Sequence, residues 1–255
     1  MNLNNKRILI TRPRAQAEKF AKVLAAQGAQ PLLFPVIQSV PPEDLTMLDR
    51  ALNALDQYDW LVFTSVHGVN FFYDRLQALG IKKLSPKLRV ATVGPRTAKA
   101  LSERGVWVEH TPDEYLPEAL LPGFGRNLYG KRFLFPQSNL ARTELASQLR
   151  AAGALVNEVV AYRTIQAEPL ASEVEALRAG VDIVTFTSPS TVHNFIEIAR
   201  KNGLDPFNLP GAPIIACIGP VTKRAAEEAG LIQPIVASQY TSDGLVEVIS
   251  NLVVS

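Results

Sequence analysis

Short apolar runs alternate with helical patterns along the whole chain. The runs are rich in Ile, Val, Leu and Phe and predict buried strands at residues 8–11, 31–37, 60–64, 89–94, 106–110, 132–136, 155–162, 182–187, 213–219 and 234–238. After Pro13, the residues Ala17, Phe20 and Leu24 share one face of a predicted helix that Gly28 ends. Strands that alternate with helices predict an α/β protein, with parallel sheets covered by helices on both faces.

The pattern occurs twice. Three pairs of segments recur in the same order at nearly equal offsets: 59–72 with 182–195, 94–105 with 219–230, and 6–29 with 131–154. The first pair agrees at six of fourteen positions and the second at six of twelve, whereas unrelated segments would agree at about one. We infer a duplicated α/β unit and therefore two domains of similar fold.

Two such units can be connected in series or interleaved, and the residues alone leave both arrangements open. One feature favours interleaving. The partly polar, extended stretches 35–40 and 161–168 follow equivalent predicted strands. They could pair as a ladder where the chain crosses from one domain to the other.

Composition narrows the function classes. The formal charge of +2 is too small to indicate nucleic-acid binding, and we expect neither a signal peptide nor a membrane span. The single cysteine, Cys217, lies in an apolar run and is expected to be a buried small hydrophobe. The histidines His67, His110 and His193 show no metal-ligand spacing. We therefore expect a cytoplasmic protein without a metal.

Candidate chemistry lies at the strand-to-helix corners, because ligands of open parallel sheets bind outside the carboxyl ends of the strands. These corners are 10–14, 63–68, 93–97, 135–139, 186–190 and 218–222. Helices that start at Gly94-Pro95 and Gly219-Pro220 have free N–H groups, which attract carboxylate or phosphate. Ser65 and Ser188 can cap their helices. Simple capping explains any one corner, but the set favours anion binding.

No motif of a common catalytic class is present. The chain has no GxGxxG after its first strand, no P-loop and no GxSxG elbow. The acidic pair Glu227-Glu228 is expected on a helix surface. These observations favour a reaction that depends mainly on holding a reactive substrate in the right shape.

Seven segments together resemble the uroporphyrinogen-III synthase family. They are ILITRP, DWLVFTSVHGV, VATVGPRTAKAL, FLFPQSNLARTELASQLRAAGALVNEVVAYRT, FTSPSTVHNF, IACIGPVTKRAAEEAGL and YTSDGLVEVI. They span nearly the whole chain in the family's order. Each is weak alone, and the VxxYRT segment and the closing T-xx-GL are the most informative.

The resemblance implies a fold. Two similar flavodoxin-like domains, each a five-stranded parallel sheet with helices on both faces, would be joined by a two-stranded β linker. Domain 1 would comprise residues 1–36 and 167–255, and the inserted domain 2 residues 41–162, with linker strands at 37–40 and 163–166. Catalysis would take place in a cleft between the domains. We expect a monomer with hinge freedom, in transient contact with the preceding enzyme of its pathway.

The resemblance also implies a reaction that uses no cofactor. The small-molecule substrate would be the linear tetrapyrrole hydroxymethylbilane, which is cyclised to uroporphyrinogen III with inversion of ring D and loss of water. The hydroxyl group would leave ring A to give an azafulvenium-like cation. Ring D would attack through its substituted carbon to give a spiro intermediate, which then fragments and recloses. The eight carboxylates of the substrate suit several helix starts.

The family's functional tyrosine falls on Tyr162, which would donate a hydrogen bond to the departing hydroxyl group. The alternative role for Tyr162 is packing at the domain linker. Substrate-binding residues implied by the resemblance and the corners are Thr11, Arg12, Ser65, Gly94, Thr97, Ser138, Asn139, Ser188, Ser190, Gly219 and Thr222. One departure from the family is Val66, where many members have proline.

Two other readings compete with the cyclase. A non-catalytic, two-lobed binding or sensor protein for an anionic metabolite would also be an internally duplicated α/β pair. A sugar-nucleotide transferase with twin α/β domains would require a longer chain and clear diphosphate-binding glycines.

Overall fold

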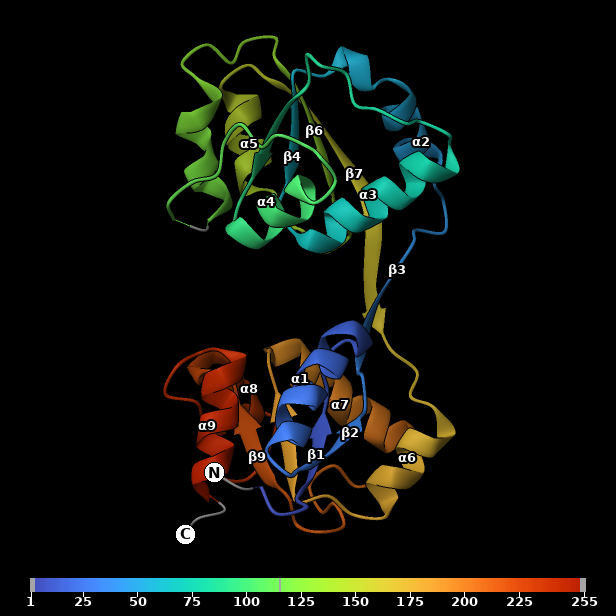
Figure 1. Ribbon diagram of the computed structural model, residues 1–255, viewed down its shortest axis with the longest axis vertical. Coiled ribbons are helices and arrows are strands. Elements are labelled where there is room, and N and C mark those ends of the chain that lie inside the picture. Colours follow the sequence, from blue (N-terminus) through green and yellow to red (C-terminus); the bar gives the residue numbers. More distant parts are fainter. Residues whose placement is uncertain (1–2, 115, 253–255) are drawn as a thin grey trace. The chain divides into compact units, whose positions relative to one another are not determined.

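The computed structural model describes residues 3–114 and 116–252. The chain divides into two compact units, which we call domain 1 (Met1–Gln38 with Ile165–Ser255) and domain 2 (Ser39–Thr164) (Figure 1). Domain 1 is therefore built from both ends of the chain. Each of the two sheets has five strands, and every strand pair of known register is parallel.

Domain 1 has the strand order β10-β9-β8-β1-β2. Its strands are β1 (Arg7–Ile10), β2 (Gln30–Leu33), β8 (Ile183–Phe186), β9 (Ile214–Cys217) and β10 (Ile235–Val236). Its helices are α1 (Arg14–Ala26), α6 (Ala171–Arg178), α7 (Pro189–Lys201), α8 (Pro220–Glu228) and α9 (Ser242–Leu252). Successive residues of a strand point to opposite faces. Accordingly, Leu9 packs in the cluster with α6, α7 and α8, and Ile8 and Ile10 pack with α1 and α9.

Domain 2 has the strand order β3-β7-β6-β4-β5. Its strands are β3 (Ile37–Val40), β4 (Trp60–Phe63), β5 (Arg89–Thr92), β6 (Arg132–Ser138) and β7 (Leu155–Gln166). Its helices are α2 (Thr46–Asn53), α3 (Val66–Ala78), α4 (Pro95–Ser102) and α5 (Glu144–Ala151), with 3-10 turns η1 (Leu55–Gln57) and η2 (Pro117–Phe124). Leu61 and Phe63 pack with α2, α3 and α4, whereas Trp60 and Val62 pack with η2 and α5.

Two predicted strands differ from the structure. The strand predicted at 31–37 is split, because β2 ends at Leu33 and β3 begins at Ile37. Pro35 lies in the gap and has no N–H group to donate to a ladder. The strand predicted at 106–110 is reduced to one bridge, between His110 and Ala91. The fifth strand of this sheet is instead β3, which lies beside the long strand β7.

The repeated segments occupy equivalent places in the two sheets. The repeats contain β1 and β8 in domain 1 and β6 and β4 in domain 2, and the repeat pair 219–230 and 94–105 directly follows β9 and β5. These strands are neighbours in the same spatial order in both sheets. The helices that follow are equivalent too, since α7 matches α3 and α8 matches α4. The internal repeat of the sequence is therefore a repeat of structure.

One repeated ion pair explains why Lys-Arg and Asp recur in the sequence. In domain 1, Asp182 accepts hydrogen bonds from the Arg7 backbone N–H (2.8 Å) and from Lys6 Nζ (3.0 Å). In domain 2, Asp59 accepts from the Arg132 backbone N–H (2.8 Å) and from Lys131 Nζ (3.1 Å). Burial acts to raise the pKa of each carboxyl group, but these hydrogen bonds outweigh it and hold both pKa values below the ordinary one.

We expect Asp182→Asn to lower the free energy of unfolding by about 1 kcal/mol at pH 7, the usual net value of a hydrogen bond. A lowered folded-state pKa stabilises the protein above the unfolded pKa of about 4, and this contribution is lost as the pH falls through the folded value. The difference from wild type should therefore shrink below pH ~4. Urea unfolding at pH 7 and at a pH below ~4 measures this difference in the free energy of unfolding. Exposed Glu18→Gln is the control. An equal difference at both pH values would contradict this account.

Candidate active site

The winding of the domain 2 sheet reverses between β4 and β6. From β4 the chain continues to β5 on one side, and then to β6 on the other. Ligand sites of open α/β sheets lie at such a point, outside the carboxyl ends of the strands. Here the ends are the Ser65 corner after β4 and the Ser138 corner at the end of β6. Both were predicted as candidate corners.

Tyr162 lies at this point. Its hydroxyl oxygen is 3.0 Å from Ser65 Oγ, which is also the N-cap of α3 and accepts a hydrogen bond from the Gly68 N–H at 3.0 Å. The Tyr162 ring stacks on Phe71, with centroids 5.4 Å apart and planes 13° apart. Only 7% of Tyr162 is exposed. The phenol group is therefore held at the start of a helix by a hydrogen bond to Ser65 and by its stacking on Phe71.

A β-bulge points Tyr162 in this direction. Gln137 pairs with Val160, but the next residue, Ser138, pairs with Tyr162, so Ala161 is left out of register. In a regular strand Ala161 and Tyr162 would face opposite sides. Here both lie in the cluster that packs against α3. Bulges commonly redirect a side chain beside a functional site, and this one brings the phenol to Ser65.

The predicted residues Ser138 and Asn139 hold the backbone of β7 around Tyr162. The Asn139 N–H donates to the Tyr162 carbonyl oxygen (3.2 Å), and Asn139 Oδ1 accepts from the Thr164 N–H (2.9 Å). Ser138 Oγ lies 3.4 Å from Thr164 Oγ1 and accepts from the Leu140 N–H. These contacts fix the carboxyl end of β6 to the segment that carries Tyr162.

Sequence reasoning missed His67 and Phe71. The centroid of the His67 ring is 5.8 Å from that of Tyr162. Burial lowers the pKa of His67, so its imidazole is neutral at pH 7. His67 lies inside the corner FTSVHG that the sequence analysis singled out, so its position was a usable signal. Phe71 follows Ser65 by six residues on α3 and gave no such signal.

The neighbouring corner of domain 2 carries Gly94 and Thr97. Gly94 is the N-cap of α4, and Pro95 is the first helical residue, as predicted. Thr97 is buried in the first turn. This corner follows β5, the neighbour of β4, so the starts of α3 and α4 lie at one edge of the sheet.

Domain 1 repeats these helix starts. Ser188 caps α7 by accepting from the Thr191 N–H, and its Oγ is 2.9 Å from that of the exposed Ser190. Gly219 is the N-cap of α8, with Pro220 next, and Thr222 is buried in the first turn. The predicted caps and helix starts of this domain are confirmed.

The comparisons with known proteins agree on one family. The profile described as "Uroporphyrinogen-III synthase HemD" matches residues 18–247. The chain belongs to the uroporphyrinogen-III synthase family. It is 33% identical over 247 residues to the uroporphyrinogen-III synthase of Synechococcus elongatus, covering 95% of this chain and 94% of that protein. It is 27% identical to the one of Chlorobaculum parvum, covering 96% and 98%.

Solved structures of the uroporphyrinogen-III synthase family share the fold. A variant of the Thermus thermophilus enzyme superposes with a TM-score of 0.62 at 21% identity, over 97% of this chain and 98% of that one. The Helicobacter pylori protein gives a TM-score of 0.61 at 18% identity, over 99% and 100%. At these identities the likeness concerns the fold alone.

Two residues predicted from the resemblance to the uroporphyrinogen-III synthase family face inward in domain 1. Thr11 is fully buried, and its hydroxyl group donates to the Thr185 carbonyl oxygen at 2.7 Å. Arg12 is 8% exposed, and its Nη1 donates to Ser242 Oγ at 2.8 Å. Its guanidinium carbon lies 4.8 Å from the centroid of the Phe20 ring. Both side chains are held by contacts inside domain 1, and their contact with a ligand stays a prediction.

The other expectations concern metals and membranes. Among the described residues, no group of three or more His, Cys, Asp or Glu side chains could hold a metal ion. Within the same residues, no helix is long and apolar enough to cross a bilayer. Cys217 is buried, as predicted, and burial raises its pKa to about 12, so it remains a thiol.

We expect Ser65→Ala to lower turnover about tenfold, because Tyr162 loses the partner that positions its hydroxyl group. Loss of the α3 cap should also reduce the free energy of unfolding by about 1 kcal/mol. Ser65→Thr keeps both a hydroxyl group and a capping oxygen and should restore most of the rate. Steady-state kinetics with parallel thermal unfolding measure both effects. If Ser65→Ala is less stable but turns over normally, Ser65 only caps α3 and does not position the Tyr162 hydroxyl group for the reaction.

Proposed function

We propose that this protein catalyses the reaction of its family, the cyclisation of hydroxymethylbilane to uroporphyrinogen III with inversion of ring D and loss of water. The observation that carries the assignment of the site is the Tyr162 hydroxyl group, held 3.0 Å from Ser65 Oγ at the start of α3. A phenol carries an O–H group that can donate a hydrogen bond as well as accept one.

The chain's own residues would contribute mainly at the first step. As the hydroxyl group leaves ring A, Tyr162 donates its hydrogen bond to the departing oxygen and passes the phenolic proton to it, so that the oxygen leaves as water. The proton released from the pyrrole carbon when the ring recloses returns to the phenolate, so the step balances. The neutral imidazole of His67, beside the Tyr162 ring, adds no positive charge next to the azafulvenium-like cation. Phe71, stacked on Tyr162, keeps the phenol in one orientation. The later attack of ring D and the reclosure depend on how the substrate is held.

Helix starts would bind the carboxylates of the substrate. Backbone N–H groups at a helix N-terminus attract anions through free donors and the helix dipole. Domain 2 offers the starts of α3 and α4 at one sheet edge, and domain 1 offers those of α7 and α8. We propose that Ser65, Gly94, Ser188, Ser190 and Gly219 mark the starts that share the eight carboxylates.

The finer description of the fold belongs to the same proposal. Counted within domain 1, the strand order is second, first, third, fourth, fifth, which is the flavodoxin-like order. We propose that both domains derive from this fold. We further propose that β3 and the end of β7 form the linker, and that the enzyme works as a monomer in the cytoplasm.

Analysis of product isomers tests this function. Freshly made hydroxymethylbilane is supplied to the protein, the products are oxidised, and the type I and type III isomers are separated. We expect type III product in excess and formed faster than the spontaneous ring closure. Formation of type I alone, at the spontaneous rate, would exclude the cyclase function. The two-lobed binding protein would then be the favoured hypothesis.

A further inference from the structure

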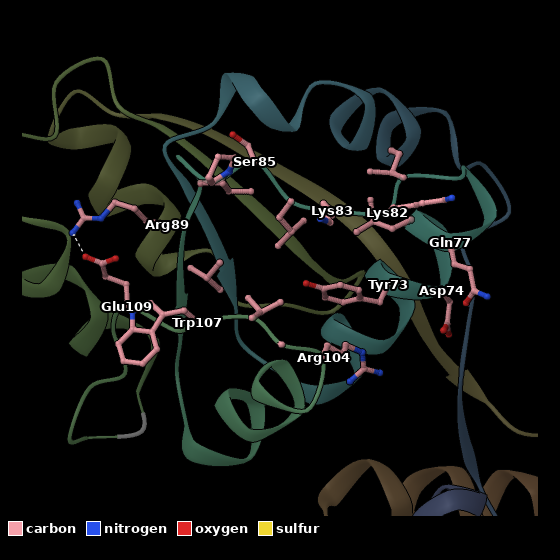
Figure 2. Close-up of a pocket in the computed structure, with 18 of the residues that line it drawn as sticks. Tyr73, Asp74, Gln77, Lys82, Lys83, Ser85, Arg89, Arg104, Trp107 and Glu109 are labelled. Carbon is pink, nitrogen blue, oxygen red and sulfur yellow. Dashed lines mark hydrogen bonds and ion pairs between the residues drawn. The ribbon is translucent and has the colours of Figure 1, made fainter.

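Domain 2 contains a pocket that the proposed reaction does not use. Its volume is about 1030 Å³, and it is lined by the end of α3, the segment 80–88, the start of β5 and residues 104–109 (Figure 2). The Tyr162 site uses the other end of α3. At about 1.5 Å per residue, Ser65 and Gln77 lie roughly 18 Å apart along the helix. The pocket is therefore a separate feature of the domain.

The floor of the pocket is apolar. Leu76 and Leu88 belong to the core cluster of domain 2, and Ile81, Leu84 and Val106 pack against it. Trp107 stands at the rim with 82% of its surface exposed. An exposed indole beside an apolar floor suits an aromatic ligand, because it adds a large flat contact.

One hydroxyl group inside the pocket is unsatisfied by the protein. The Tyr73 hydroxyl oxygen is buried and has no hydrogen-bond partner among the described residues. Figure 2 shows it pointing toward the middle of the lining residues. Buried polar groups are nearly always paired, so a polar group of a ligand or of solvent belongs beside it. Burial raises the pKa of Tyr73 to about 12, so this group keeps its proton and can donate a hydrogen bond.

The charge of the lining favours an anion. Four basic and two acidic side chains line the pocket. Arg89 is paired with Glu109 at 2.8 Å. Arg104 donates to Ala100 and Asn70 and lies over the Tyr73 ring, 5.4 Å from its centroid. Lys82 and Lys83 are exposed and form no ion pair within the described part of the chain. Their charges are available to a bound carboxylate.

We propose that this pocket is a second ligand site of the protein, which binds an aromatic carboxylate. The aromatic body lies against Trp107 and the apolar floor. The carboxylate pairs with Lys82 and Lys83 and accepts a hydrogen bond from the Tyr73 hydroxyl group. This site stands independently of the proposed catalytic function, because none of its residues takes part in that function.

Tryptophan fluorescence provides the test. The chain has two tryptophans, and Trp60 is 1% exposed whereas Trp107 is 82% exposed. A ligand at the rim should therefore change the emission of Trp107 alone. The probe is 3-phenylpropanoate, with uncharged 3-phenylpropan-1-ol and non-aromatic butanoate as matched controls. We expect saturable binding of the acid with a dissociation constant of about 1 mM or below, and at least tenfold weaker binding of both controls.

Variants separate the contributions of the lining residues. The double variant Lys82→Ala/Lys83→Ala should bind the acid about tenfold more weakly and leave the alcohol unaffected. Tyr73→Phe should weaken the binding of 3-phenylpropanoate about threefold. Calorimetric titration of Trp107→Phe checks binding without the reporter. Absence of saturation up to about 20 mM, or equal affinity of the wild type and both variants for the acid, would overturn the proposal.

Discussion

Tyr162→Phe is expected to lower the rate of type III formation about a hundredfold, the lower end of the usual range for a positioned acid or base. The variant removes only the oxygen that lies 3.0 Å from Ser65 Oγ. The phenyl ring can still stack on Phe71, so the fold should persist. Loss of one hydrogen bond costs about 1 kcal/mol of stability. Since the hydroxyl group acts while the leaving oxygen departs, kcat should fall and KM should change little.

Tyr58→Phe is a matched control for this prediction. Tyr58 is also in domain 2, and its hydroxyl oxygen accepts a hydrogen bond from Asn157 Nδ2 at 2.6 Å. Its loss should therefore cost similar stability without changing turnover. Product isomers are separated for both variants, and thermal unfolding is followed in parallel. Turnover of Tyr162→Phe within about twofold of wild type would show that Tyr162 is a packing residue of β7 and not the donor.

Local features of the fold could be predicted because they depend on neighbours in the sequence. Ser65 and Ser188 accept from the first-turn N–H groups of their helices, and Gly94 and Gly219 precede helices that begin with proline. Each of these features is set within four residues. The internal repeat also allowed the similarity of the two domains to be predicted, because segments of similar sequence form equivalent strands and helices in the two sheets.

Features that depend on distant residues could not be predicted. The bulge at Gln137 and Ser138 arises where two strands meet, and strict alternation along β7 would have pointed Tyr162 away from α3. Arg12 is predicted to meet a carboxylate, and its hydrogen bond to Ser242, 230 positions later, could not be predicted from neighbouring residues. The inward direction of Thr11 depends likewise on the Thr185 carbonyl of a neighbouring strand.

The residues of the closing T-xx-GL segment are required by the packing of the first turn of α9. This packing predicts a large loss of stability when the glycine is replaced. Thr241 Oγ1 accepts from the Gly244 N–H at 3.0 Å in the first turn of α9. A Cβ atom at Gly244 would lie 2.2 Å from the Gln239 carbonyl oxygen. Only glycine allows this close approach of helix and backbone. The approach seats Leu245, Val246 and Ile249 in the core of domain 1.

We expect Gly244→Ala to destabilise domain 1 by about 2 kcal/mol, although alanine is the better helix former. Helix propensity favours alanine by about 1 kcal/mol, but a clash with backbone that cannot rotate away costs about 3 kcal/mol. Exposed Asp243→Ala, in the same turn, is the control, and its loss of a favourable helix-dipole contact should cost about 0.5 kcal/mol.

Urea unfolding followed by two signals locates the effect. Both tryptophans, Trp60 and Trp107, lie in domain 2, so fluorescence reports that domain, whereas far-ultraviolet circular dichroism reports both. The variant should shift the circular dichroism transition to lower urea and leave the fluorescence midpoint in place. A variant as stable as wild type would mean that the first turn of α9 can move away from Gln239. The glycine of the motif would then need a reason other than packing, such as close approach of a ligand to the backbone.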